Sequence, residues 1–123
     1  NEGTITMFGS VSGYLGRSLN PYYAAAKRSL ESYFESISFE NTKKKIRIQF
    51  YILGYLETNL SFGKKLMLPK GSVKKLSEKV FKNRNKKFKK FYFPAWWGII
   101  IFILKFLPFY FLLIFNNIKK KND

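Results

Sequence analysis

The order strand, loop, helix, strand in the first half of the chain is the feature that most constrains its fold. Residues 4–8 are β-branched or apolar, which predicts a short buried strand. Asn20 and Pro21 form a helix start, with Asn as the N-cap and Pro in the first turn, and apolar side chains then recur every three or four residues to about Glu40. Apolar side chains alternate over 46–53 and run together at its end, which predicts a second strand buried on both faces. A βαβ unit of this kind implies a parallel sheet with right-handed crossovers.

The composition excludes several kinds of chemistry. The chain has 123 residues, enough for one domain or part of one, and its 46% hydrophobic and 20% aromatic content excludes disorder of the whole chain. It contains no Cys and no His, so disulfides, thiol catalysis, Ser-His-Asp triads and His- or thiolate-ligated metal centres are excluded, and we predict no metal site. Because the sequence opens on Asn1, directly inside a strand-like pattern, we expect the chain to be a fragment.

Charge divides the chain into three segments. The net charge is +16, and residues 64–93 hold twelve Lys or Arg against one acidic residue. We therefore predict a folded segment 1–63, a basic helical segment 64–93 that contains a helix over 72–81, and an apolar tail 94–123.

Tyr23 and Lys27 are four residues apart at the start of the predicted helix, so their side chains lie on one face. A Lys ammonium beside a phenol stabilises the phenolate form, which makes Tyr23 a candidate general acid or base. The chain is so rich in Tyr and Lys that about one Tyr-x-x-x-Lys is expected by chance, so the pair alone indicates no function.

Other residues surround this pair in a fixed order. Ser10 lies thirteen residues before Tyr23, just after the first strand, and Gly54 and Thr58 follow the second strand. With this set, the chain resembles the short-chain dehydrogenase/reductase family, closely over residues 1–63. In that family a Ser-containing loop ends one strand, Tyr-x-x-x-Lys opens the next helix, and a Pro-Gly-x-x-x-Thr segment follows the next strand.

The resemblance implies an α/β fold, the C-terminal part of a Rossmann-type domain with a doubly wound parallel sheet, followed here by the basic helix and the apolar helical tail. It also implies hydride transfer between a nicotinamide cofactor and an alcohol or ketone. Tyr23 would exchange a proton with the substrate oxygen, Lys27 would support Tyr23 and bind the nicotinamide ribose, and Ser10 would stabilise the substrate oxygen. Ser12 is interpreted as loop filler.

The same resemblance assigns the contacts with NAD or NADP, which this segment does not distinguish. The expected cofactor-binding residues are Tyr23, Lys27, Gly54, Leu56 and Thr58. Leu53 stands where the family usually has Pro. The family's first half, with its Gly-rich dinucleotide loop, has no counterpart in this sequence, so we expect activity to require that missing half.

The tail leaves three interpretations open. The apolar stretch 95–115 has 21 residues, enough to span a bilayer core, although Lys105 at its middle would cost about 2.5–3.5 kcal/mol there. Pro108 would split the stretch into two segments, 96–107 and 109–118, which could lie in the membrane interface. The third interpretation is an extension that folds over the substrate cleft.

Both membrane interpretations predict association through residues 95–118, at the cytoplasmic face, because the preceding basic residues would attract anionic lipid and favour that side. An apolar, lipid-like substrate and a possible homo-oligomer are further expectations. Two alternative functions remain: a non-catalytic, membrane-associated remnant of such an enzyme, and, less favoured, a basic nucleic-acid-binding module with aromatic residues between its lysines.

Overall fold

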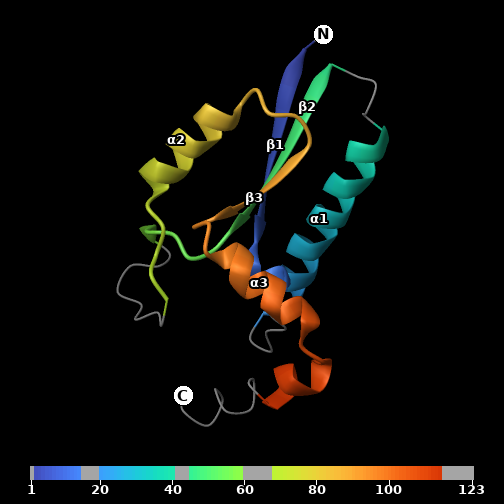
Figure 1. Ribbon diagram of the computed structural model, residues 1–123, viewed down its shortest axis with the longest axis vertical. Coiled ribbons are helices and arrows are strands. Elements are labelled where there is room, and N and C mark those ends of the chain that lie inside the picture. Colours follow the sequence, from blue (N-terminus) through green and yellow to red (C-terminus); the bar gives the residue numbers. More distant parts are fainter. Residues whose placement is uncertain (1, 15–19, 41–44, 60–67, 115–123) are drawn as a thin grey trace.

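The computed structural model describes residues 2–14, 20–40, 45–59 and 68–114 (Figure 1). Strands and helices alternate along the chain, as expected for an α/β protein. The elements, in chain order, are β1 (Gly3–Ser10), the 3-10 turn η1 (Val11–Gly13), α1 (Pro21–Glu40), β2 (Ile46–Leu53), α2 (Val73–Asn83), β3 (Lys89–Phe93) and α3 (Trp97–Phe106).

The three strands form one parallel sheet in the order β1-β2-β3. Ser10 pairs with Leu53, and Leu53 pairs with Phe93, so the carboxyl ends of all three strands meet at one edge of the sheet. This confirms the predicted α/β class and its Rossmann-like arrangement. In open α/β sheets that edge is where ligands bind.

Helices cover both faces of the sheet. On the central strand, Ile48, Phe50 and Ile52 belong to the core cluster formed with α1 and α3, whereas Tyr51 belongs to the cluster that Leu76 of α2 completes. All four of these β2 side chains are at most 1% exposed, which confirms the prediction of a strand buried on both faces. Figure 1 shows α1 and α2 on opposite sides of the strands.

The two crossover connections of the sheet differ in hand, although right-handed crossovers were expected for the predicted βαβ unit. The connections β1–α1–β2 and β2–α2–β3 advance in the same direction across the sheet but cross opposite faces. Their hands are therefore opposite, and only one of them follows the usual rule. The physical reason lies in the core. Trp97 and Ile101 of α3 already pack on the face that α1 covers, and α2 buries its apolar side against Tyr51 and Phe93 on the other face.

The predicted helix starts are confirmed. The Asn20 side chain accepts a hydrogen bond from the Tyr23 backbone N–H (3.2 Å), and Ser72 accepts one from the Lys75 backbone N–H (3.4 Å). The strand β3, within the basic segment, was not expected from the sequence. Its five residues include two lysines, and pairing with β2 is what makes the segment a strand.

The first helix of the predicted apolar tail is part of the core. Trp97 and Ile101 of α3 are 1% and 0% exposed. The helix ends at Phe106, before Pro108 as expected, and residues 109–114 are helical again. In the part of the chain that the structure describes, no helix has both the length and the apolar character needed to cross a membrane. Residues 115–118 of the predicted membrane segment lie outside the described residues.

Candidate active site

Ser10 is the last residue of β1 and the N-cap of the turn η1. Its Oγ accepts a hydrogen bond from the backbone N–H of Ser12 (3.2 Å) and lies 2.5 Å from the Ser12 Oγ. Val11, between them, is 3% exposed, which anchors the turn in the core. Gly13 brings the turn close to α1, since a β-carbon there would lie 3.4 Å from the Arg28 backbone nitrogen. The loop with the candidate catalytic Ser is therefore held rigidly between β1 and α1.

Tyr23 and Lys27 lie in the first two turns of α1, with Tyr23 46% exposed. The Lys27 Nζ donates a hydrogen bond to the carbonyl oxygen of Phe8 (3.0 Å) and lies 5.7 Å from the centroid of the Tyr23 ring. Phe8 is two residues before Ser10 on β1. Lys27 thus connects the Tyr23 ring to the strand that carries Ser10. Its positive charge lies beside the ring and beside the end of that strand.

The loop after β2 starts at the same edge of the sheet. Gly54 follows Leu53, the β2 partner of Ser10, and its backbone N–H donates to the Phe93 carbonyl (2.8 Å). Leu56 pairs with Gly71 in a parallel bridge and is half-buried, and Thr58 is exposed. The structure therefore gathers Ser10, Tyr23, Lys27 and Gly54 at one edge, with Leu56 and Thr58 further along the loop.

A buried charged cluster behind this edge was not foreseen. Glu31 of α1 is 3% exposed, and its carboxylate accepts hydrogen bonds from the Tyr14 hydroxyl, from Lys90 of β3 (2.7 Å) and from Arg28 (2.9 Å). Lys90 also bonds to Glu35. The cluster ties the residue after η1 to α1 and β3. One sequence signal could have revealed this cluster: Glu31 is an acidic residue between Leu30 and Phe34, on the apolar stripe of the helix.

Three groups in the cluster, Glu31, Tyr14 and Lys90, have displaced pKa values. Burial by itself would raise the pKa of Glu31, but the hydrogen bonds from Lys90 and Tyr14 and the nearby cations outweigh it, so the pKa lies below its usual range. Burial, together with the hydrogen bond to Glu31, raises the pKa of Tyr14. Burial would lower the pKa of Lys90, but the two carboxylates raise it. At neutral pH the cluster therefore holds ionised Glu31 and Lys90 and a neutral Tyr14.

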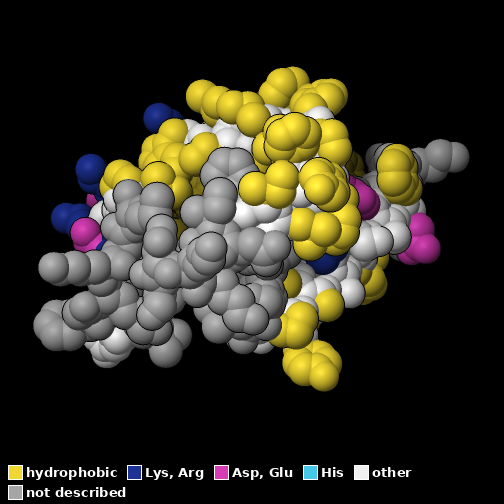
Figure 2. Space-filling view, turned by 90° about the horizontal axis from the view of Figure 1, so that it is seen from below, with side chains coloured by type: hydrophobic (Ala, Val, Ile, Leu, Met, Phe, Trp, Pro, Cys, Tyr) yellow, Lys and Arg dark blue, Asp and Glu magenta, His cyan; other side chains and the backbone are white. Residues whose placement is uncertain are grey.

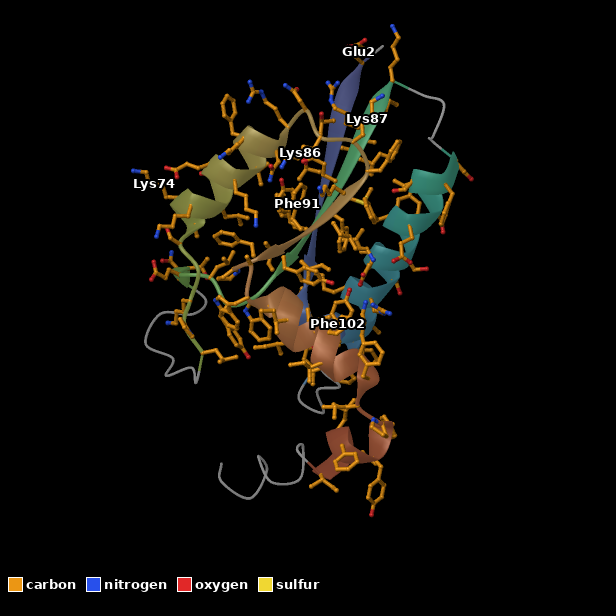
Figure 3. All side chains as sticks on the ribbon, viewed as in Figure 1. Glu2, Lys74, Lys86, Lys87, Phe91 and Phe102 are labelled. Atoms are coloured by element: carbon orange, nitrogen blue, oxygen red, sulfur yellow. The ribbon has the colours of Figure 1, made fainter. Side chains whose placement is uncertain are left out.

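In the basic segment around α2 and β3, some aromatic rings pack against other side chains of the protein. The Phe91 ring stacks on Tyr51 (4.8 Å between centroids), and the Nζ atoms of Lys79 and Lys86 lie 5.9 and 5.7 Å from its centroid. Figure 3 shows Phe91 among these elements and Lys74 extending outward from α2. A ring packed in this way is not a stacking platform for a base, whereas Phe81 of α2 is 67% exposed.

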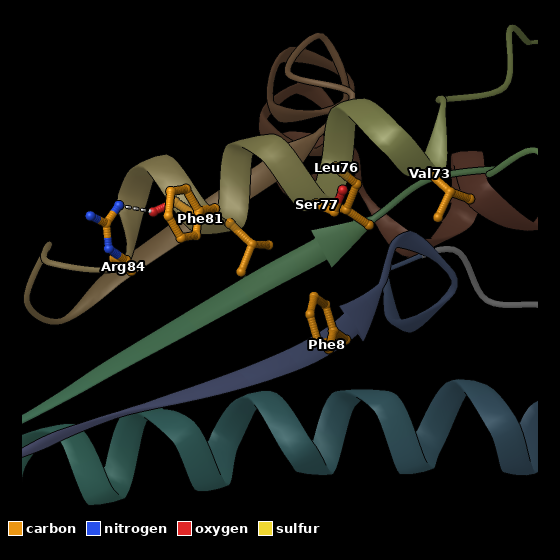
Figure 4. A pocket seen from close by; sticks show the side chains of 7 residues that line it. Phe8, Val73, Leu76, Ser77, Phe81 and Arg84 are labelled. Carbon is orange, nitrogen blue, oxygen red and sulfur yellow. Dashed lines mark hydrogen bonds between the residues drawn. The ribbon is translucent and has the colours of Figure 1, made fainter.

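An apolar groove lies between β1 and α2, on the face of the sheet opposite α1 (Figure 4). Phe8 forms its floor, and residues from α2 and the turn after it form its wall. The lining side chains are Phe8, Val73, Leu76, Ser77, Val80, Phe81 and Arg84. None of the predicted site residues belongs to this lining.

Comparison with known proteins finds two distant relatives by sequence. No protein-family model matches the chain. The chain is 27% identical over 109 residues to two Xenopus laevis proteins, hydroxysteroid 11-beta-dehydrogenase 1-like protein B and hydroxysteroid 11-beta-dehydrogenase 1-like protein A. Each alignment covers 85% of this chain but only 37% of the relative, so the chain spans little more than a third of the length of these proteins. The similarity is distant and concerns only part of each relative.

Proposed function

We propose that this chain carries the catalytic part of a short-chain dehydrogenase/reductase, which transfers a hydride between NAD(P) and an alcohol or ketone. The observation that carries the proposal is the position of Lys27, whose ammonium bonds to the Phe8 carbonyl and lies over the Tyr23 ring. This contact joins two separate parts of the family pattern, the strand that ends in Ser10 and the helix that opens with Tyr23. The similarity to two proteins named as dehydrogenase-like, found independently of the geometry, supports the same reaction class.

Each residue has a role that its position allows. Tyr23, partly exposed, gives its phenol proton to a carbonyl oxygen during reduction, or takes the proton of an alcohol during oxidation. Lys27 places its charge beside the ring and stabilises the phenolate that results. Ser10 donates a hydrogen bond to the same substrate oxygen, where negative charge develops.

The nicotinamide end of a dinucleotide fits this edge of the sheet. Lys27 and Gly54 lie at the carboxyl ends of parallel strands, the position at which such folds bind nucleotides. When bound, the nicotinamide supplies or accepts the hydride. Lys27 would hold its ribose, and Gly54, Leu56 and Thr58 would line its outer side. Because the relatives are much longer than this chain, the proposed activity is that of a protein that also supplies the phosphate-binding loop.

The proposed substrate is an apolar alcohol or ketone, because both relatives are named hydroxysteroid 11-beta-dehydrogenase 1-like proteins and because α3 and the residues after it expose many apolar side chains. Figure 2 shows hydrophobic side chains gathered over much of the described surface seen from below. Several apolar side chains of α3 and of residues 109–114 are more than half exposed: Ile99, Phe102, Ile103, Phe106, Phe109, Tyr110 and Phe111.

This apolar surface supports a second part of the proposal, that the protein lies on a membrane interface through residues 95–114. Lys105, the cation within the apolar stretch, turns back onto the protein, with its Nζ 5.3 Å from the centroid of the Tyr14 ring. Its charge is therefore held beside an aromatic ring, while Phe102 and Phe106 remain available to lipid. The excess of Lys and Arg over residues 64–90, which precede this stretch in the sequence, favours the cytoplasmic side.

Replacing Tyr23 by Phe in the full-length protein tests the catalytic proposal. The variant Tyr23→Phe lacks the transferable proton but keeps the ring, so turnover should fall at least about 100-fold with little change in stability. Tyr22→Phe is the matched control, because Tyr22 is the adjacent residue and is 87% exposed. It should retain full activity. Lys27→Ala should lower turnover and also raise the KM for the cofactor.

Steady-state kinetics with NADH and NADPH and a panel of apolar ketones gives the readout. If Tyr23→Phe kept more than about a tenth of the wild-type rate, Tyr23 would not be the acid or base. A full-length protein that folds and binds membranes but turns over no substrate with either cofactor would support the alternative, a non-catalytic remnant.

A further inference from the structure

We propose that Ser12 is a positioning residue, which directs the hydroxyl proton of Ser10 toward the substrate oxygen. The inference rests on the proposed function, because it concerns the orientation of a group in that site. It goes beyond the sequence pattern, in which Ser12 is an ordinary residue of the loop.

Two contacts join the serines, and the one between their hydroxyl oxygens is short. The Ser12 Oγ lies 2.5 Å from the Ser10 Oγ, and the Ser12 backbone N–H donates to the same Ser10 oxygen at 3.2 Å. Ser12 is 9% exposed, and its neighbour Val11 is 3% exposed. Both contacts are therefore made by a residue that the core holds in place.

Hydrogen-bond counting shows what each direction of the bond between the two hydroxyls leaves on Ser10. A serine hydroxyl has one proton to donate and two lone pairs that accept. If Ser12 donates its hydroxyl proton to Ser10, that bond and the bond from the Ser12 N–H occupy both lone pairs of Ser10. The Ser10 hydroxyl can then form only one more hydrogen bond, in which it donates its own proton. Ser10 then acts purely as a donor, which is what a developing oxyanion requires.

The reverse direction gives a different site. If Ser10 donated to Ser12, its proton would be committed within the loop, and a lone pair of Ser10 would face the substrate oxygen. Two oxygen lone pairs repel each other. The reduction of a ketone thus needs Ser12 as the donor and Ser10 as the acceptor of the 2.5 Å bond.

The experiment compares Ser12→Ala, Ser12→Thr and Ser10→Ala in the active full-length protein. Ser12→Ala keeps the backbone N–H but removes the hydroxyl donor, so kcat for ketone reduction should fall about tenfold, the effect of one hydrogen bond. The KM for the cofactor and the melting temperature should change little. Ser12→Thr restores a hydroxyl at the same atom position and should recover most of the rate.

The double variant Ser10→Ala, Ser12→Ala separates positioning from a general structural effect. If Ser12 acts through Ser10, its replacement should cost no further rate once Ser10 has been replaced. Additive losses, an unchanged kcat in Ser12→Ala, or no recovery in Ser12→Thr would each overturn the inference. These results are distinct from failure of the proposed function itself, in which Ser10→Ala and Tyr23→Phe would also keep the wild-type rate; that outcome overturns both.

Discussion

The indole nitrogen of Trp97 lies against Gly54, so close that a β-carbon on Gly54 would stand 1.9 Å from it. Trp97 is the first residue of α3 and is 1% exposed, and its Nε1 has no hydrogen-bond partner in the part of the chain that the structure describes. The first helix of the apolar tail therefore packs directly under the loop that is proposed to bind the nicotinamide. Only a residue without a side chain fits between them.

Gly54→Ala should consequently destabilise the protein, by about 1–3 kcal/mol, because the added methyl group must displace a buried ring. Gly3→Ala is the matched control, since no atom lies within 4 Å of a β-carbon built there, and it should change stability by less than about 0.5 kcal/mol. Urea unfolding measures both variants. In a Trp97→Leu background the penalty of Gly54→Ala should shrink; an undiminished penalty would mean that the indole is not its cause.

The Glu31 cluster predicts a loss of stability in acid. Because the folded state holds the pKa of Glu31 below its unfolded value of about 4.3, ionised Glu31 contributes stability at every pH above that value. The contribution disappears as the pH falls through the lower folded-state pKa. Unfolding free energy should thus be steady near neutrality and decrease below about pH 4.

Glu31→Gln should lower the unfolding free energy at pH 7 by about 1–3 kcal/mol, since it removes the buried carboxylate that accepts from Tyr14, Arg28 and Lys90. It should also flatten the acid decline. Glu35→Gln is the control: the Glu35 side chain is 50% exposed and bonds to the same Lys90, so its loss should cost less than about 1 kcal/mol. Equal pH profiles for Glu31→Gln and the wild type would contradict the assignment of the decline to Glu31.

The apolar surface predicts binding to lipid vesicles. The full-length protein should co-sediment with anionic vesicles, and the double variant Phe102→Ser, Phe106→Ser should bind at least about tenfold more weakly, because two large exposed rings no longer insert. Tyr33→Ser is the control, an aromatic residue of α1 that is 58% exposed, compared with 63% and 73% for the two phenylalanines. It should bind normally.

Salt distinguishes insertion from electrostatic attraction in the same assay. High salt screens the basic residues but does not affect inserted rings, so it should weaken the binding only in part. Complete release of the wild-type protein at high salt would remove the insertion hypothesis.

Local patterns in the sequence were sufficient to predict the first two strands and the helices α1 and α2. The N-caps Asn20 and Ser72, the apolar stripe of α2 and the alternation in β2 depend on neighbouring residues, and such signals can be seen without the rest of the fold. The spacing of Ser10, Tyr23 and Lys27 was visible for the same reason. Their placement at one edge of the sheet follows once the two strands are known to be parallel.

Tertiary contacts decided the rest. Residues 89–93 became a strand because β2 offered an edge to pair with, and a run of lysines gave no sign of it. Trp97 and Ile101 were buried because α1 leaves part of its face of the sheet uncovered, although the surrounding composition resembled a membrane segment. Glu31 kept its charge inside the protein because Lys90, 59 residues away in sequence, lies within 2.7 Å. The sequence by itself determines elements whose causes lie within a few residues, and only the folded chain determines which distant surfaces those elements bury.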